Sequence, residues 1–230
     1  GFAGVLAGVG AHVVLAARRT ERIEALAAAL PDALAVTVDV TDDDGPQDLV
    51  DAVLARYGRL DVLVNNAGIS RVVPAVDDDL AGFRHELAVD LVAPYELSRR
   101  AAQWWIAEDH PGVVVNVGSV LGEENGGRLL LTTYAAAKGG LHNLTRELAV
   151  QWARKGIRVN ALAPGWFETE MNSDDMFHTD AGLAYIGDGA ALGRGGRSHE
   201  LDGALLLLAS DASSYLTGHV LLVDGGWTAA

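Results

Sequence analysis

The stretch Gly112-Val113-Val114-Val115-Asn116-Val117-Gly118 decides the fold class that we expect for this chain of 230 residues. A short run that is apolar on both sides is typical of a parallel strand buried between two layers of helices. Comparable runs, separated by helical patterns, predict further strands at His12–Ala17, Ala33–Asp39, Leu60–Asn65, Ile157–Ala163 and His219–Val223. The helical patterns lie at Gly1–Val9, Glu21–Leu30, Gly45–Tyr57, Asp78–Trp105, Thr133–Lys155 and His199–Ser210. This alternation predicts one α/β domain over residues 1–230, with a doubly wound parallel sheet in three layers.

Composition excludes several classes of partner. The net charge is -14, which disfavours nucleic acid and anionic membrane surfaces. The chain has no cysteine, and its seven histidines are scattered without the spacing of metal ligands, so we expect no metal site. The apolar stretch Gly203–Ala209 is far too short to span a bilayer, and no signal peptide is visible. We therefore expect a cytoplasmic protein that binds neither nucleic acid nor membrane.

Tyr134 and Lys138 form the pair with the clearest chemical meaning. Only two of the 17 basic residues are lysines, and one of them follows this tyrosine by four positions on a predicted helix. Positions i and i+4 share a helix face, so the ammonium should stand beside the phenol and favour its ionised form. Such a tyrosine is a candidate general acid or base. The alternative is a surface tyrosine next to a solvated lysine.

Five motifs in a fixed order resemble the short-chain dehydrogenase/reductase family in its compact form, over essentially the whole chain. They are Asn65-Asn66-Ala67-Gly68, Ser119 after a strand, Tyr134-Ala135-Ala136-Ala137-Lys138, Arg158-Val159-Asn160-Ala161-Leu162-Ala163-Pro164-Gly165 with Thr169, and Tyr215-Leu216-Thr217-Gly218 leading to Val223-Asp224-Gly225-Gly226. The resemblance implies a Rossmann-like domain and an oxidoreductase that interconverts a ketone and a secondary alcohol by hydride transfer.

The resemblance also implies catalytic roles. Tyr134 would pass a proton to or from the substrate oxygen, Lys138 would hold the nicotinamide ribose, and Ser119 would orient the carbonyl. Ser119 could otherwise be an ordinary turn residue at the end of a strand. Asp90 stands where the family usually has an asparagine in a proton relay that reaches the lysine. We expect the relay to survive, with an added attraction to Lys138, because aspartate has nearly the same shape.

Cofactor contacts follow from the same resemblance. Besides Tyr134 and Lys138, they are expected at Asp39, Val40, Asn66, Ala67, Gly68, Pro164, Gly165, Phe167 and Thr169. Asp39 could also be only a cap. The position where an acidic residue would bind the ribose of NAD is Ala17, and Arg18 and Arg19 follow it. Guanidinium groups bind phosphate well, so we expect NADP(H).

Substrate and assembly are less sharply defined. Residues 170–197 correspond to the variable lid over the substrate site, although they could also form an inert surface loop. We expect a small-molecule carbonyl or alcohol rather than a carrier protein, whose docking would rely on Arg99, Arg100 and Arg128. The resemblance suggests a homotetramer or homodimer. Glu123 and Glu124 are expected on a solvated loop face, the alternative being a filter against anionic substrates.

One departure concerns the beginning of the chain. The first strand and glycine-rich turn of the family are expected upstream of Gly1, so the first strand of the fold would be absent here and its neighbours would have unpaired edges. This leaves an alternative function, a catalytically impaired nucleotide-binding or scaffold protein on the same fold.

Overall fold

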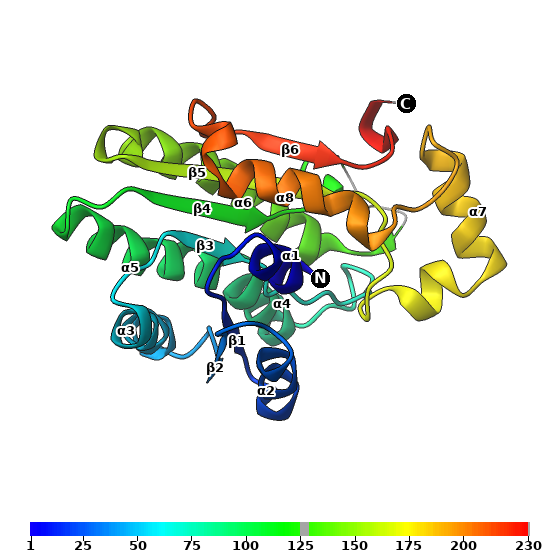
Figure 1. Cartoon of the computed structure of the whole chain (residues 1–230). Coiled ribbons are helices and arrows are strands. Elements are labelled where there is room, and N and C mark those ends of the chain that lie inside the picture. Colours follow the sequence, from blue (N-terminus) through cyan, green and yellow to red (C-terminus); the bar gives the residue numbers. More distant parts are fainter. Residues whose placement is uncertain (125–128, 230) are drawn as a thin grey trace.

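Parallel strands form the central layer of the computed structural model, which describes residues 1–124 and 129–229 (Figure 1). The strands are β1 (Val14–Ala17), β2 (Leu34–Thr37), β3 (Val62–Asn65), β4 (Gly112–Val117), β5 (Ile157–Pro164) and β6 (Val220–Val223). These strands pair in parallel, in the order β1-β2 in one sheet and β3-β4-β5-β6 in another. The predicted parallel α/β, Rossmann-like class is confirmed, with the strands of the described residues grouped into two sheets instead of one.

Helices cover both faces of the larger sheet. The α-helices are α1 (Phe2–Gly8), α2 (Thr20–Ala28), α3 (Gly45–Tyr57), α4 (Leu80–Leu87), α5 (Ala93–Ala107), α6 (Thr132–Trp152), α7 (Asp180–Gly189) and α8 (Asp202–Ala209). Shorter turns are η1 (Ala88–Val92), η2 (Val120–Gly122), η4 (Ala153–Lys155), η5 (Ser173–Phe177), η6 (Ser198–Leu201), η7 (Asp211–Ser213) and η8 (Trp227–Ala229). Helices α5 and α6 pack on one face, and α8 with α1 beside it packs on the other (Figure 1). None of the helices among the described residues has the length and hydropathy to cross a membrane.

The core on each face is built by apolar side chains of the strands and helices. Trp105 of α5 is fully buried, and its Nε1 donates to the Leu60 carbonyl at 2.7 Å. On the opposite face, Leu205 and Leu208 of α8 are fully buried against Leu162 of β5. Burying each of these side chains contributes about 1.5–3 kcal/mol. Both faces of β4 and β5 are therefore shielded from water, and the polar residues of interest lie where the strands end.

One predicted helix is wrong in a way that matters for the site. Asp78–Trp105 is not continuous but consists of α4, the π-helical turn η1 and α5. Pro94 has no N–H to donate to the Asp90 carbonyl, so the regular α-helical ladder cannot run through this point. The π-turn that results carries Asp90. Helix α7 was also missed, because residues 170–197 were predicted only as a lid or loop.

Candidate active site

The first turns of α6 bring Tyr134 and Lys138 together. The Lys138 Nζ lies 5.4 Å from the centre of the Tyr134 ring, so the two side chains share a helix face as predicted. Lys138 is only 4% exposed, whereas Tyr134 is half-buried. The ammonium lies 3.0 Å from the Asp90 Oδ1 and donates to the Val117 carbonyl at 3.1 Å. The alternative of a solvated lysine is therefore wrong.

Asp90 joins this pair from a second helix. Its side chain is fully buried, and its Oδ2 accepts a hydrogen bond from the Ile69 N–H at 3.1 Å. Burial raises the pKa of Asp90, while Lys138 and the Ile69 N–H oppose that rise. Gly68 packs directly on the ion pair, since a Cβ there would lie 2.8 Å from the Asp90 Oδ1 and 3.5 Å from the Lys138 Nζ. The structure thus brings three of the predicted residues into one cluster.

Ser119 follows β4 at the edge of this cluster. It is 8% exposed, and its Oγ accepts from the Leu121 N–H at 3.2 Å, which makes it the cap of the turn η2. That turn rests against α6, because a Cβ on Gly122 would lie 2.8 Å from the Lys138 carbonyl carbon. The capping role and a role toward a substrate are compatible, since the hydroxyl can still donate its proton.

A buried histidine packs against the same turn. His142 is 1% exposed, and a Cβ on Gly118 would lie 2.2 Å from its Nε2. Its Nδ1 is 2.9 Å from the Glu123 Oε1, to which Arg146 also donates at 3.0 Å. Burial lowers the pKa of His142, and Arg146 and Lys138 lower it further against the effect of Glu123. Glu123 is exposed, as predicted, but its carboxylate is bonded to these two side chains.

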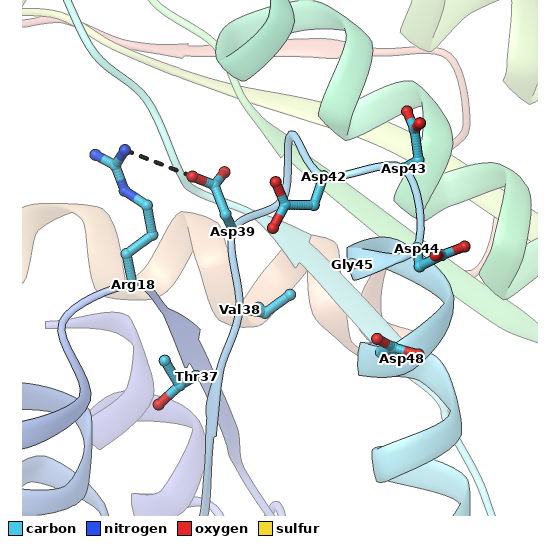
Figure 2. Close-up of a pocket in the computed structure, with 9 residues that line it drawn as sticks. All are labelled: Arg18, Thr37, Val38, Asp39, Asp42, Asp43, Asp44, Gly45 and Asp48. Carbon is cyan, nitrogen blue, oxygen red and sulfur yellow. Dashed lines mark ion pairs between the residues drawn. The ribbon is translucent and has the colours of Figure 1, made fainter.

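A cavity of about 550 Å³ opens at the carboxyl ends of β1 and β2 (Figure 2). Its lining residues are Arg18, Thr37, Val38, Asp39, Asp42, Asp43, Asp44, Gly45 and Asp48. The Asp39 Oδ1 accepts from the N–H and hydroxyl of Thr41, which lower the pKa of Asp39, and its Oδ2 lies 3.6 Å from the Arg18 Nη1. Val40 instead packs on the core. Asp39 thus caps its own loop and faces the cavity as well.

Arg19 lies apart from this cavity. Its guanidinium is 3.4 Å from the Glu170 Oε2, and Arg22 binds the same carboxylate. These guanidinium groups lower the pKa of Glu170 to about 2. The predicted phosphate-binding pair is therefore divided, with Arg18 at Asp39 and Arg19 at Glu170.

Other predicted cofactor contacts also follow strands. Asn66 and Ala67 are exposed after β3, and Pro164 ends β5. A Cβ on Gly165 would lie 2.7 Å from the Asp224 Cα, so only glycine permits this approach of two chain segments. These backbones are grouped at the carboxyl edge of the sheet.

Phe167 and Thr169 continue this segment toward residues 170–197. Phe167 is 7% exposed and packs in the core below α8, so its ring is turned away from solvent. The Thr169 N–H and hydroxyl both bond the Asn172 Oδ1 at 2.9 Å. Only the main chain of Phe167 is available for a ligand, whereas Thr169 keeps an exposed side chain.

Three aromatic rings link residues 170–197 to the end of the chain. The ring centres of Trp166, Tyr185 and Trp227 are 5.4–5.8 Å apart. The Trp227 indole N–H also bonds the Glu124 carboxylate, so Glu124 is half-buried and bonded, where a solvated loop residue was expected. The sequence analysis missed Trp227, because nothing in its spacing connects it with Tyr185.

Similar proteins identify the family. The family model described as "Enoyl-(Acyl carrier protein) reductase" matches residues 1–228. Cis-4-hydroxycyclohexanecarboxylate dehydrogenase of Sinomonas cyclohexanicum is 40% identical over 230 residues, covering 98% of this chain and 90% of the relative. 2-dehydro-3-deoxy-D-gluconate 5-dehydrogenase of Escherichia coli (strain K12) is 34% identical over 221 residues, covering 96% and 85%.

A solved structure agrees with these relatives. Gluconate 5-dehydrogenase from Burkholderia cenocepacia J2315, in complex with NADP and tartrate, is 35% identical with a TM-score of 0.92, covering 100% of this chain and 90% of that one. This chain belongs to the short-chain dehydrogenase/reductase family, as the sequence motifs predicted. The similar proteins named here are dehydrogenases, so the family-level activity is that of an oxidoreductase.

Proposed function

We propose that this protein is an NADP(H)-dependent oxidoreductase that interconverts a small ketone and its secondary alcohol, with Tyr134 as acid and base. The observation that carries the proposal is the buried Lys138 ammonium beside the Tyr134 ring, 5.4 Å from its centre. A cation fixed at this place stabilises a phenolate, which can remove the proton from an alcohol.

The residues fit a nicotinamide dinucleotide in two respects. The Gly68 backbone lies close against the Asp90–Lys138 pair, and the cavity at the end of β2 has Arg18 on its rim (Figure 2). The acidic side of that cavity favours an uncharged ring, whereas Arg18 on its rim would hold a 2′-phosphate, and Arg19 would join it by leaving Glu170. The similar gluconate 5-dehydrogenase contains NADP, which supports the choice of this cofactor.

Each catalytic residue would have a separate task. When bound, the nicotinamide would supply or accept the hydride. In the oxidation direction, Tyr134 takes the hydroxyl proton of the alcohol, and Ser119 donates a hydrogen bond to the same oxygen. Lys138 keeps its charge beside the phenol and, with Asp90, is held in place by burial and by the Val117 carbonyl. Lys138 would also hold the ribose, next to the backbones of Asn66 to Gly68.

The substrate we favour is a small hydroxy acid or polyol. Two of the similar proteins are named for gluconate derivatives. Residues 170–197 would cover the site as a lid, with Trp166 and Tyr185 on its inner side. A carrier protein is less well supported, since Arg99 and Arg100 both bond Glu96 and Arg128 lies outside the described residues.

The test compares Tyr134→Phe with Tyr215→Phe, which removes a hydroxyl from a fully exposed ring. NADPH oxidation is followed with a panel of ketones and keto acids, and NADP⁺ reduction is followed with the corresponding alcohols, sugar acids and polyols. We expect Tyr134→Phe to lose about 10²–10⁴-fold in kcat and the control to retain full activity. Equal activity of the two variants would refute the acid/base role. Turnover by neither the wild type nor the control would favour the nucleotide-binding alternative.

A further inference from the structure

Glu86 is a buried carboxylic acid that the proposed reaction does not yet use. It lies on α4 and is fully buried, and neither of its carboxyl oxygens makes a well-formed hydrogen bond among the described residues, although the Arg71 backbone N–H interacts with the carboxyl group. An unpaired carboxylate in such a place would be very costly, so the group must be neutral or electrostatically balanced. The charged groups around Glu86 therefore determine its protonation state.

Glu86 lies in a row of residues that ends at Lys138. Gly82, Glu86 and Asp90 follow one another at intervals of four along α4 and η1, so they share one side of this helical segment. The Arg71 guanidinium lies over Gly82, where a Cβ would be 1.7 Å from its Nη1. At the other end of the row, the Asp90 Oδ1 is 3.0 Å from the Lys138 Nζ.

The charged groups around Glu86 come from each neighbouring element. Asp90 lies on η1 and Lys138 on α6, while Arg71 and Asp78 lie on the segment before α4 and form a pair at 2.9 Å. Burial and then Asp90 raise the pKa of Glu86 to about 7, and Arg71 opposes them. Two neighbouring carboxyl groups of this kind lose their protons in two separate steps, because the first negative charge disfavours the second.

We propose, on the basis of the proposed function, that Glu86 is a positioning residue that shares one proton with Asp90 and so limits this carboxyl pair to a single negative charge beside Lys138. With one proton on the pair, the charge of Asp90 balances that of Lys138. When the pair releases this proton to solvent, a second negative charge appears in the same cluster. That charge counteracts the ammonium, and the Tyr134 phenolate becomes harder to form. The hydride and proton transfers themselves are unchanged.

The kinetic test uses Glu86→Gln, which keeps the shape of the protonated acid but cannot ionise. Exposed Glu147 on α6 supplies the matched control, Glu147→Gln. For alcohol oxidation, activity rises with pH as the phenolate forms. We expect this ascending limb of the kcat/KM profile of Glu86→Gln to move about one unit to lower pH, the order of effect of one charge about 10 Å away at an effective dielectric constant near 20. The control should keep the wild-type profile. A Glu86→Gln profile that coincides with that of the wild type overturns the proposal.

A second measurement needs neither a variant nor activity. In wild-type protein labelled with ¹³C at the glutamate carboxyl, one resonance should titrate with a midpoint near 7. If every glutamate resonance titrates with a midpoint below about 5.5, nearer the ordinary value, the shared proton does not exist and the proposal is wrong. The proposed function fails separately, through equal activity of Tyr134→Phe and Tyr215→Phe.

Discussion

The Lys138 Nζ lies 3.0 Å from the Asp90 Oδ1, and both side chains are almost completely removed from water. A buried pair of this kind gains little over an apolar pair, but removing one partner leaves an uncompensated charge. We expect Lys138→Met to lower the free energy of unfolding by about 3–5 kcal/mol. The double variant Lys138→Met/Asp90→Asn should recover much of that loss. Urea unfolding at pH 7 measures both, and equal losses in the single and double variants would contradict the pairing.

Gly68 should not tolerate a side chain. A Cβ at this position would lie 2.8 Å from the Asp90 Oδ1, so Gly68→Ala must displace the carboxylate or the ammonium. We expect at least about a tenfold loss of kcat, because small misplacements of catalytic groups cost up to about 10²-fold. Gly4→Ala is the matched control, since nothing lies within 4 Å of its Cβ position. Normal activity of Gly68→Ala would argue against a catalytic role of this cluster.

His142 should make stability depend on pH. Its pKa is lowered in the folded protein, so its contribution is complete above the unfolded value of about 6.5 and is lost as the pH falls toward the folded value. Between pH 7.5 and 5.5, wild type should lose about 1 kcal/mol more unfolding free energy than His142→Gln. His199→Gln, at an exposed position, should behave as wild type. If the unfolding free energies of all three proteins change with pH in the same way, His142 does not have this role in stability.

Arg18 and Arg19 should determine the choice of cofactor. We expect Arg18→Ala/Arg19→Ala to weaken NADPH binding about 10–100-fold and to leave NADH binding nearly unchanged, because only NADPH carries the 2′-phosphate. Arg59→Ala is the control. Arg59 pairs with Asp61 at the amino end of β3, whereas Arg18 and Arg19 follow the carboxyl end of β1. Fluorescence titration gives the Kd values. Tighter binding of NADH than NADPH by the wild type would sink the NADP(H) proposal.

Exposed apolar side chains on α6 and α5 favour the expected homotetramer or homodimer. Val150 is 81% exposed on α6, and Tyr95 and Ile106 of α5 are each 41% exposed. Val150→Asp should shift the mass seen in light scattering toward the monomer, because the charge would be buried in the interface. Asp211→Asn, at an exposed position in the turn η7, is the control. A monomeric wild type would contradict the prediction.

The sequence predicted the elements best where apolar periodicity was strong. The strands β3 to β6 and the helix carrying Tyr134 and Lys138 lie within about two residues of their expected places, because burial on both sides leaves few alternatives. The interruption at Asp90 was missed, although Pro94 could have indicated it through its missing N–H. Helix α7 was missed because residues 170–197 mix glycine and aspartate with few apolar positions.

The site was only partly readable from the sequence. The pairing of Asp90 with Lys138 was anticipated through the family resemblance, and the geometry agrees with it. Glu86 was overlooked, although a carboxylic acid four residues before Asp90 was a usable signal. The bond between Glu170 and Arg22 joins residues 148 positions apart, and no local pattern connects them. Contacts of this kind depend on the tertiary fold, which single-residue patterns do not describe.

The three-ring contact of Trp166, Tyr185 and Trp227 has a practical consequence. Aromatic chromophores held this close couple their electronic transitions, so near-ultraviolet circular dichroism should contain a band specific to this cluster. Since Tyr185 lies on α7, that band provides an optical reporter for the arrangement of residues 170–197, readable in the native protein without an attached dye.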